Sequence, residues 1–184
     1  LIEQLQFTGQ ESIQHKEIKS KLNFNHPCKE LMWFVTSSDS SVSNNHWMNY
    51  TTNLTGEPGN TEDGIVSHLS ASGIASKNPI TSAKLVLNGN DRFAQRDGLY
   101  FNLVQPYQHH ENIPVNAGIN VYSFALKPEE HQPSGTLNMS RIDTAVLNIS
   151  SDIDATNNKN LNVYAVNYNV LRIMSGMGGI AYSN

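Results

Sequence analysis

Residues 13–24 read Ile-Gln-His-Lys-Glu-Ile-Lys-Ser-Lys-Leu-Asn-Phe, and the second half of this stretch decides the fold class. Apolar Ile18, Leu22 and Phe24 alternate with charged and polar neighbours. A repeat of two residues is typical of a β-strand that buries one face and leaves the other in water, as in an antiparallel sheet. The stretch therefore predicts a strand of an antiparallel sheet.

The same period of two recurs along the chain and predicts further strands. The full set lies at residues 1–7, 13–24, 30–36, 80–87, 119–126, 136–142, 144–149 and 161–173. These eight strands have uneven lengths and are separated by turn-forming residues. The pattern predicts an all-β, two-sheet sandwich, either an eight-stranded antiparallel jelly roll or a fibronectin-like sandwich.

Two regions depart from the strand pattern. Phe93, Tyr100 and Phe101 fall near helical spacing, so we expect at most one short helix, within residues 92–104, followed by a loop between Pro106 and Pro114. Residues 175–179 are rich in glycine and follow the last strand. They predict a flexible turn rather than a phosphate-binding loop, because no helix can follow.

The length of 184 residues suits a single domain spanning 1–184. A long surface loop, residues 37–80, is rich in Ser, Asn, Thr and Gly, and loops of this length are usually functional or mobile. Trp47 and Tyr50 belong to its main apolar cluster and are candidate outer-loop contacts. Because the chain begins at Leu1 within a predicted strand, we expect it to be part of a longer polypeptide.

The composition excludes several classes of protein. Charged residues make up only 15% of the chain, the net charge is −4, and no basic cluster is present, which argues against direct contact with nucleic acid. No apolar run approaches the roughly 20 residues of a membrane-spanning helix. The single cysteine, Cys28, excludes an internal disulfide and is expected to be a buried, inert thiol.

The histidines and carboxylates do not form a recognisable catalytic, cofactor-binding or metal site. His109 and His110 are adjacent, and neighbouring side chains on an extended chain point to opposite faces, so the two do not readily face one ion. Glu130 and His131 lie in a turn between two prolines, with no further ligand spaced to join them. We therefore expect no enzyme activity, no cofactor and no bound metal.

Four Asn-x-Ser/Thr sequences mark potential N-glycosylation sites, at Asn49, Asn53, Asn138 and Asn148. In a chain this rich in Asn, Ser and Thr, several such sequences arise by chance. They matter only if the protein meets a glycosylation machinery, and the two in the long loop are the better candidates.

Several long motifs resemble the major capsid proteins of nucleocytoplasmic large DNA viruses, with algal-virus, giant-virus and Marseille-type relatives the most similar. They are GINVYSFALKPEEHQPSGT at 118–136, SRID at 140–143, NGNDRF at 88–93, YFNLVQPYQHH at 100–110 and YNVLRIMSGMGG at 168–179. One departure is Leu-Asn-Met at 137–139, where many relatives carry Cys-Asn-Phe. The exchange replaces apolar residues by apolar ones and leaves the resemblance intact.

The resemblance implies a subunit built from two consecutive jelly rolls, of which this chain is similar to the second. Three subunits would form a trimer of pseudo-hexagonal outline, and many trimers would tile an icosahedral shell in the virion. The implied partners are further copies of the chain and minor capsid proteins, with an internal viral membrane nearby and no membrane span of its own. The resemblance makes His109, His110, Glu130, His131 and Arg141 candidates for contacts between subunits.

Two alternatives fit the same fold class. A carbohydrate-binding jelly roll for host attachment would stack sugar rings on Trp47 or Tyr50. A jelly-roll enzyme of the cupin kind would need two or three histidines and a carboxylate converging inside the barrel. The histidines of this chain fall mostly in predicted loops and turns, which counts against the enzyme.

Overall fold

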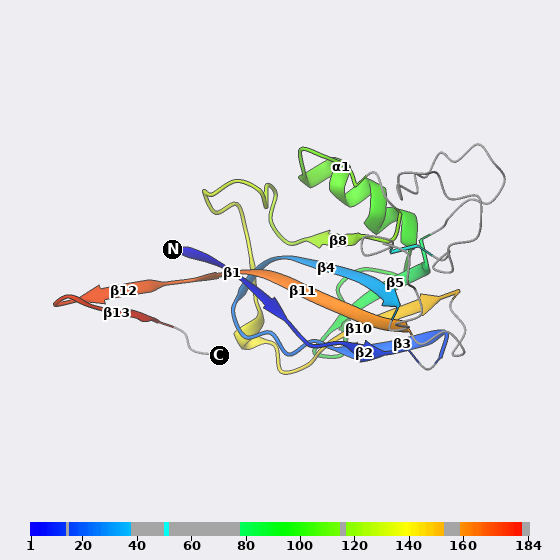
Figure 1. The fold of residues 1–184 in the computed structure, drawn as a ribbon, viewed down its shortest axis with the longest axis horizontal. Helices are drawn as coiled ribbons and strands as arrows, with labels where there is room; N and C mark the ends of the chain where they lie inside the picture. The colour runs from blue at the N-terminus through cyan, green and yellow to red at the C-terminus, as the bar shows by residue number, and fades with distance from the viewer. Residues whose placement is uncertain (14, 38–49, 52–77, 115–116, 153–158, 182–184) are drawn as a thin grey trace.

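The computed structural model describes residues 1–13, 15–37, 50–51, 78–114, 117–152 and 159–181, and the statements below concern these residues. Two antiparallel β-sheets pack face to face around one apolar core (Figure 1). A short helical segment lies along the end of one sheet, and a separate β-hairpin extends from the body near the N-terminus.

The first sheet has the order β1-β11-β4-β8. Its strands are β1 (Ile2–Phe7), β11 (Lys159–Asn169), β4 (Pro27–Ser37) and β8 (Asn120–Ser123), with β2 (Glu11–Ser12) against β11 and β9 (Leu137–Asn138) against β4. The second sheet has the order β3-β10-β5-β6. Its strands are β3 (Glu17–Lys21), β10 (Ala145–Ser151), β5 (Ile80–Leu87) and β6 (Asn90–Asp91), with β7 (Arg96–Asp97) also against β5.

The chain crosses repeatedly between the two sheets. β1, β4, β8 and β11 belong to the first sheet, and β3, β5 and β10 belong to the second. The chain therefore changes sheet at nearly every long connection, and the last long strand, β11, lies between β1 and β4. This nesting of late strands between early ones is the jelly-roll topology. The predicted all-β jelly roll is confirmed, and the fibronectin-like alternative is wrong.

The core is formed by alternate residues of the central strands. Leu31, Trp33 and Val35 of β4 are buried and face Leu85 of β5 and Leu147 of β10 in one cluster. β4 pairs on one side with β11 and on the other with β8, so both of its edges are satisfied. The strand predicted at 30–36 is thus found as β4, in the interior of the first sheet.

The strand predicted at residues 136–142 differs in the structure. Residues 136–142 form only the two-residue β9 and then a 3-10 turn, η2 (Met139–Arg141), because the Asn138 side chain accepts the backbone N–H of Ser140 and caps the turn. The strands β6 and β7 were not predicted, because each has only two residues and so shows no alternation of apolar and polar side chains. The described residues form thirteen strands rather than the eight predicted, because the two-residue strands β2, β6, β7 and β9 and the β12–β13 pair add to the longer ones.

The helix prediction placed the helix too early in the chain. A π-helical turn, η1 (Tyr100–Val104), leads into α1 (Gln105–His109), and Pro106 lies in the first turn of α1. Proline is common in the first turn of helices, where its fixed φ of about −65° suits the helical backbone. The expected loop starting at Pro106 was therefore wrong.

The end of the last long strand also differs. β11 stops at Asn169, and β12 (Leu171–Met174) and β13 (Met177–Ile180) form a hairpin of their own. Ser175 and Gly176 make its turn with φ of 50° and 80°. Positive φ at both central residues matches the twist of a tight hairpin. The glycine-rich run is thus a hairpin turn with its second strand.

Strand boundaries account for the remaining differences. The strands expected at 13–24 and 119–126 shorten to β3 and β8, while β4 begins at Pro27 rather than at residue 30. Proline is accepted as the first residue of a strand.

Candidate functional site

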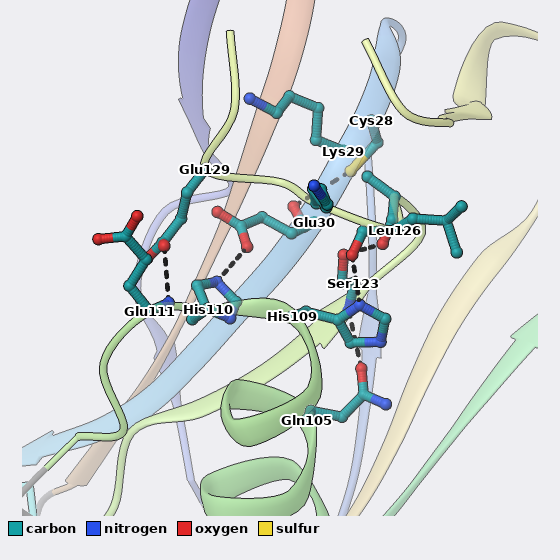
Figure 2. Close-up of polar contacts among 12 residues, drawn as sticks. Cys28, Lys29, Glu30, Gln105, His109, His110, Glu111, Ser123, Leu126 and Glu129 are labelled. Carbon is teal, nitrogen blue, oxygen red and sulfur yellow. Dashed lines mark hydrogen bonds and ion pairs between the residues drawn. The ribbon is translucent and has the colours of Figure 1, made fainter. Parts of the chain in front are cut away.

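The end of α1 is attached to the sheet and to a neighbouring loop through both histidines of the predicted pair (Figure 2). His109 Nδ1 lies 2.9 Å from the carbonyl oxygen of Leu126. His110 Nε2 lies 2.8 Å from Glu30 Oε2 of β4. Because the helix ends at His109 and His110 is extended, the two rings diverge and reach separate partners. This agrees with the expectation that they do not face one ion.

A second set of contacts holds the segment at residues 124–134, which connects β8 to β9. The backbone N–H of Glu111 donates to Glu129 Oε2 over 2.8 Å. The N–H groups of Phe124 and Ala125 both donate to the carbonyl of Lys29, over 2.8 and 3.2 Å. α1, β4 and the 124–134 segment thus meet at one polar cluster.

The electrostatics of this cluster favour a charged imidazole. The hydrogen bond that His110 donates to Glu30 raises the pKa of His110 above its ordinary value of 6.5, while partial burial lowers it and the charges of Glu30 and Glu129 raise it further. The Nδ1 atom of His110 is buried and has no hydrogen-bond partner within the described part of the chain. The His110 ring therefore has a hydrogen bond at Nε2, to Glu30, and none at Nδ1 within the described residues.

The helix also covers the free edge of β8. Asn102 Nδ2 donates to the carbonyl of Ile119 over 2.6 Å, and the N–H of Ser123 donates to Gln105 Oε1 over 3.1 Å. These side chains satisfy backbone groups that would otherwise invite pairing with another strand. This edge of the first sheet is closed.

The β12–β13 hairpin is the most exposed apolar feature in the described part of the chain. Every residue of both strands is exposed, and the ribbon extends away from the body (Figure 1). Its large apolar side chains are Leu171, Ile173, Met174, Met177 and Ile180. An isolated two-stranded ribbon is marginally stable in water, and contiguous exposed apolar side chains mark interaction surfaces.

The outer face of the first sheet is a second apolar surface. Leu1, Leu5 and Phe7 share its exposed face, and Leu5 is 60% exposed. The Phe7 ring stacks on Tyr164 at 4.5 Å between ring centroids. Across the other sheet, the outward positions of β3 and β5 carry charged side chains such as Lys19 and Lys84. The two outer faces therefore differ in polarity.

The remaining predicted contact residues are found at separate places. His131 and Arg141 are exposed. Lys127 Nζ lies 2.8 Å from Glu130 Oε1, and this ion pair raises the pKa of Lys127. Tyr50 packs on Phe34 at 4.6 Å between ring centroids. Trp47 lies outside the described residues, as does most of the loop at 37–80.

The two described glycosylation candidates differ in accessibility. Asn138 is exposed, and its Oδ1 accepts from the hydroxyl of Ser140 over 2.6 Å. Asn148 lies in the middle of β10, paired on both sides, and its Oδ1 is buried. Asn49 and Asn53 lie outside the described residues.

The described residues include one cysteine and several possible metal ligands. Cys28 is buried, and burial raises the pKa of its thiol, so the reactive thiolate is disfavoured. Nowhere in the described ranges do three His, Cys, Asp or Glu side chains gather closely enough to hold a metal ion. Within the same ranges, no helix has the length and apolar character that crossing a membrane requires.

The comparisons with known proteins bear on these surfaces. The family model of the large eukaryotic DNA virus major capsid protein matches residues 1–179. The chain belongs to this major capsid protein family. The resemblance seen in the sequence motifs is confirmed, and the family is one of structural rather than catalytic proteins.

This capsid family member is similar to major capsid proteins of algal viruses. It is 49% identical to that of Pyramimonas orientalis virus, over 100% of this chain and 43% of the relative. It is 44% identical to that of Phaeocystis pouchetii virus, over 100% of this chain and 48% of the relative. The chain therefore spans about half the length of the curated relatives it matches.

Solved capsid structures share the fold. The quasi-atomic model of the PBCV-1 virus capsid superimposes with a TM-score of 0.73 at 39% identity, covering 99% of this chain and 51% of that one. The major capsid protein P2 of bacteriophage PM2 superimposes with a TM-score of 0.50 at 11% identity, over 91% of this chain. The second likeness concerns the fold alone.

The contacts of Glu30 and Glu129 were not foreseen from the sequence. His110 and Glu30 are 80 positions apart, and no short motif links them. One usable signal was the run Lys29-Glu30, a pair of charges at the start of an apolar strand, which requires partners once buried.

Proposed function

We propose that this chain is one jelly roll of a double jelly-roll capsid subunit, and that the subunits form trimeric capsomers of pseudo-hexagonal outline in the icosahedral shell of a large DNA virus. The family match over residues 1–179 carries this proposal. The coverage of 51% of the PBCV-1 capsid chain supports one roll of two. The virion shell is then its place of action.

The exposed apolar surfaces support assembly. The β12–β13 hairpin presents Ile173 and Met177, exposed by 70% and 75%, and nothing in the described part of the chain covers them. Burying such side chains against another chain or another domain of the subunit removes apolar area from water. We propose this hairpin as a principal assembly contact.

Other contacts are proposed with it. The exposed His131 and Arg141 remain candidates for contacts between subunits, and minor capsid proteins are candidate partners of the outer surfaces. The net charge of −4 supports a shell role without direct contact with the genome.

Sedimentation of the purified protein tests the proposal. The unmodified full-length subunit should sediment as a trimer. The proposed contacts between its copies are those of an obligate assembly, which buries well over about 2,000 Å² and stays associated in solution. Exchanging Ile173 and Met177 for serine should shift it toward monomer without changing its circular dichroism. The matched control is Lys19→Ser, an exposed change on the polar sheet face. A stable, monodisperse monomer of the unmodified full-length subunit would contradict the proposal.

A further inference from the structure

The 124–134 segment has no regular secondary structure, and it depends on a few polar contacts for its position. Its beginning is fixed by the Lys29 carbonyl, which accepts from Phe124 and Ala125. Its middle is fixed to α1 through His109 and to the residue after His110 through Glu129. The segment displays Leu126, which is 73% exposed. Its position therefore decides which surface this end of the molecule presents.

His110 lies at the centre of these contacts (Figure 2). Its ring bonds to Glu30, and the next residue, Glu111, bonds through its N–H to Glu129. Both side chains of the His110–Glu30 pair are nearly buried, with 13% and 10% exposed. A pair that is shielded from water interacts more strongly than one at the surface.

We propose that the His110–Glu30 pair is a proton-dependent clamp, which fastens the end of α1 and the 124–134 segment to β4 while His110 is protonated and loosens them when the proton is lost. The charged groups around His110 are almost all acidic. Glu30 faces it from β4, Glu129 approaches from the 124–134 segment, and Glu111 follows it in the chain. The nearby cations are engaged elsewhere, since Lys29 contacts Glu3 and Lys127 contacts Glu130.

The direction of the pH dependence follows from the sign of the shift. The pKa of His110 is raised above 6.5 when the clamp is closed, mainly by the Glu30 hydrogen bond. Below this ordinary value the proton is bound in both the closed and the open state, so the full stabilisation is present. As the pH rises through the raised pKa, the proton is lost and the stabilisation disappears. The clamp therefore holds near pH 6 and weakens under alkaline conditions.

Hydrogen exchange of individual amides measures the clamp directly. The reporters are the N–H groups of Glu111, Phe124 and Ala125, and Leu147 of the core is the internal reference. Protection factors, corrected for intrinsic exchange, should fall between about pH 6 and about pH 9, roughly tenfold for each unit by which closing raises the pKa. The protection of Leu147 should stay constant.

Two variants and one control complete the test. His110→Gln keeps a donor but cannot carry charge, and Glu30→Gln removes the charged acceptor, so both should abolish the pH dependence of the reporter amides. His131→Gln, an exposed exchange on the same segment, should preserve it. Unchanged Leu147 protection identifies variants that are folded. Reporter protection that does not vary with pH in the unmodified protein, or that varies equally in folded His110→Gln, would overturn the proposal.

Discussion

Lys29 of β4 contacts Glu3 of β1 on the outer face of the first sheet, with 2.6 Å between Lys29 Nζ and Glu3 Oε1. The intervening strand is β11, so the pair joins two strands that are not hydrogen-bonded neighbours. The Lys29 ammonium also lies 5.0 Å from the centroid of the Tyr168 ring. The two partners differ in exposure, since the Lys29 side chain is 2% exposed and that of Glu3 is 39% exposed.

This difference predicts unequal effects of removing each partner. Glu3→Gln leaves a buried ammonium without its counter-charge and should lower the free energy of unfolding by about 1–3 kcal/mol. Lys29→Met leaves a carboxylate that water can reach and an apolar side chain in a buried place, and should be close to neutral. Urea denaturation measures both, with the exposed Glu11→Gln as the control. A larger loss for Lys29→Met than for Glu3→Gln would contradict this account.

Alanine substitutions at Gly118 and Gly9 distinguish the cost of backbone strain from the cost of a steric clash. Both have positive φ, of +101° and +93°. A Cβ at Gly118 would lie 2.0 Å from the backbone oxygen of Tyr50, whereas a Cβ at Gly9 would meet nothing within 4 Å. Gly9→Ala should therefore cost about 1–2 kcal/mol, from the conformation alone. Gly118→Ala should cost clearly more in the same thermal or urea unfolding experiment, and equal losses would show that the close approach is relieved easily.

The sequence predicted most of this fold because most of its strands are buried on one face. Ile18 of β3 lies between two charged residues, and Ala83 and Leu85 of β5 share one buried face. The strand predicted at 80–87 has the bounds of β5, and β3 lies within the strand predicted at 13–24. β6 and β7 were missed because two residues cannot show a period. The helix lies later in the chain than predicted, because a proline usually ends a helix whereas Pro106 lies in the first turn of α1.

The polar cluster was only half predictable. The sequence singles out His109 and His110, and the family resemblance makes them candidates for contacts between subunits. Their partners within the chain, Leu126 and Glu30, were not predicted. Their partners are brought close by the topology of the sheets rather than by local spacing. The outward direction of Leu5 was also invisible to periodicity, because alternation shows which residues share a face and not which face is buried.

Cys28 should be chemically silent in the folded protein. It is fully buried, and burial raises the pKa of its thiol. A maleimide reagent at mildly alkaline pH should therefore leave the native protein unlabelled and should modify it fully in denaturant. Because the chain contains a single cysteine, mass spectrometry gives the labelled fraction without ambiguity. Rapid labelling under native conditions would show that β4 opens locally.

Gln105 should stabilise the protein by covering the edge of β8. Its Oε1 accepts the N–H of Ser123, and both residues are buried. Gln105→Leu keeps similar volume but leaves that N–H without an acceptor, so the free energy of unfolding should fall by about 1–3 kcal/mol. Gln108→Leu, on an exposed position of the same helix, is the matched control and should change stability by less than about 0.5 kcal/mol.

Hydrogen exchange distinguishes edge protection from simple helix packing. If Gln105 acts through the sheet edge, the Ser123 amide should lose protection in Gln105→Leu while the amide of Leu147 in β10 keeps its own. The exposed edge is also a template for pairing with another strand, so this variant should aggregate sooner than Gln108→Leu on prolonged incubation. Loss of stability with Ser123 still protected would assign the role of Gln105 to the hydrogen bond that its Nε2 donates to the Tyr100 hydroxyl over 3.0 Å.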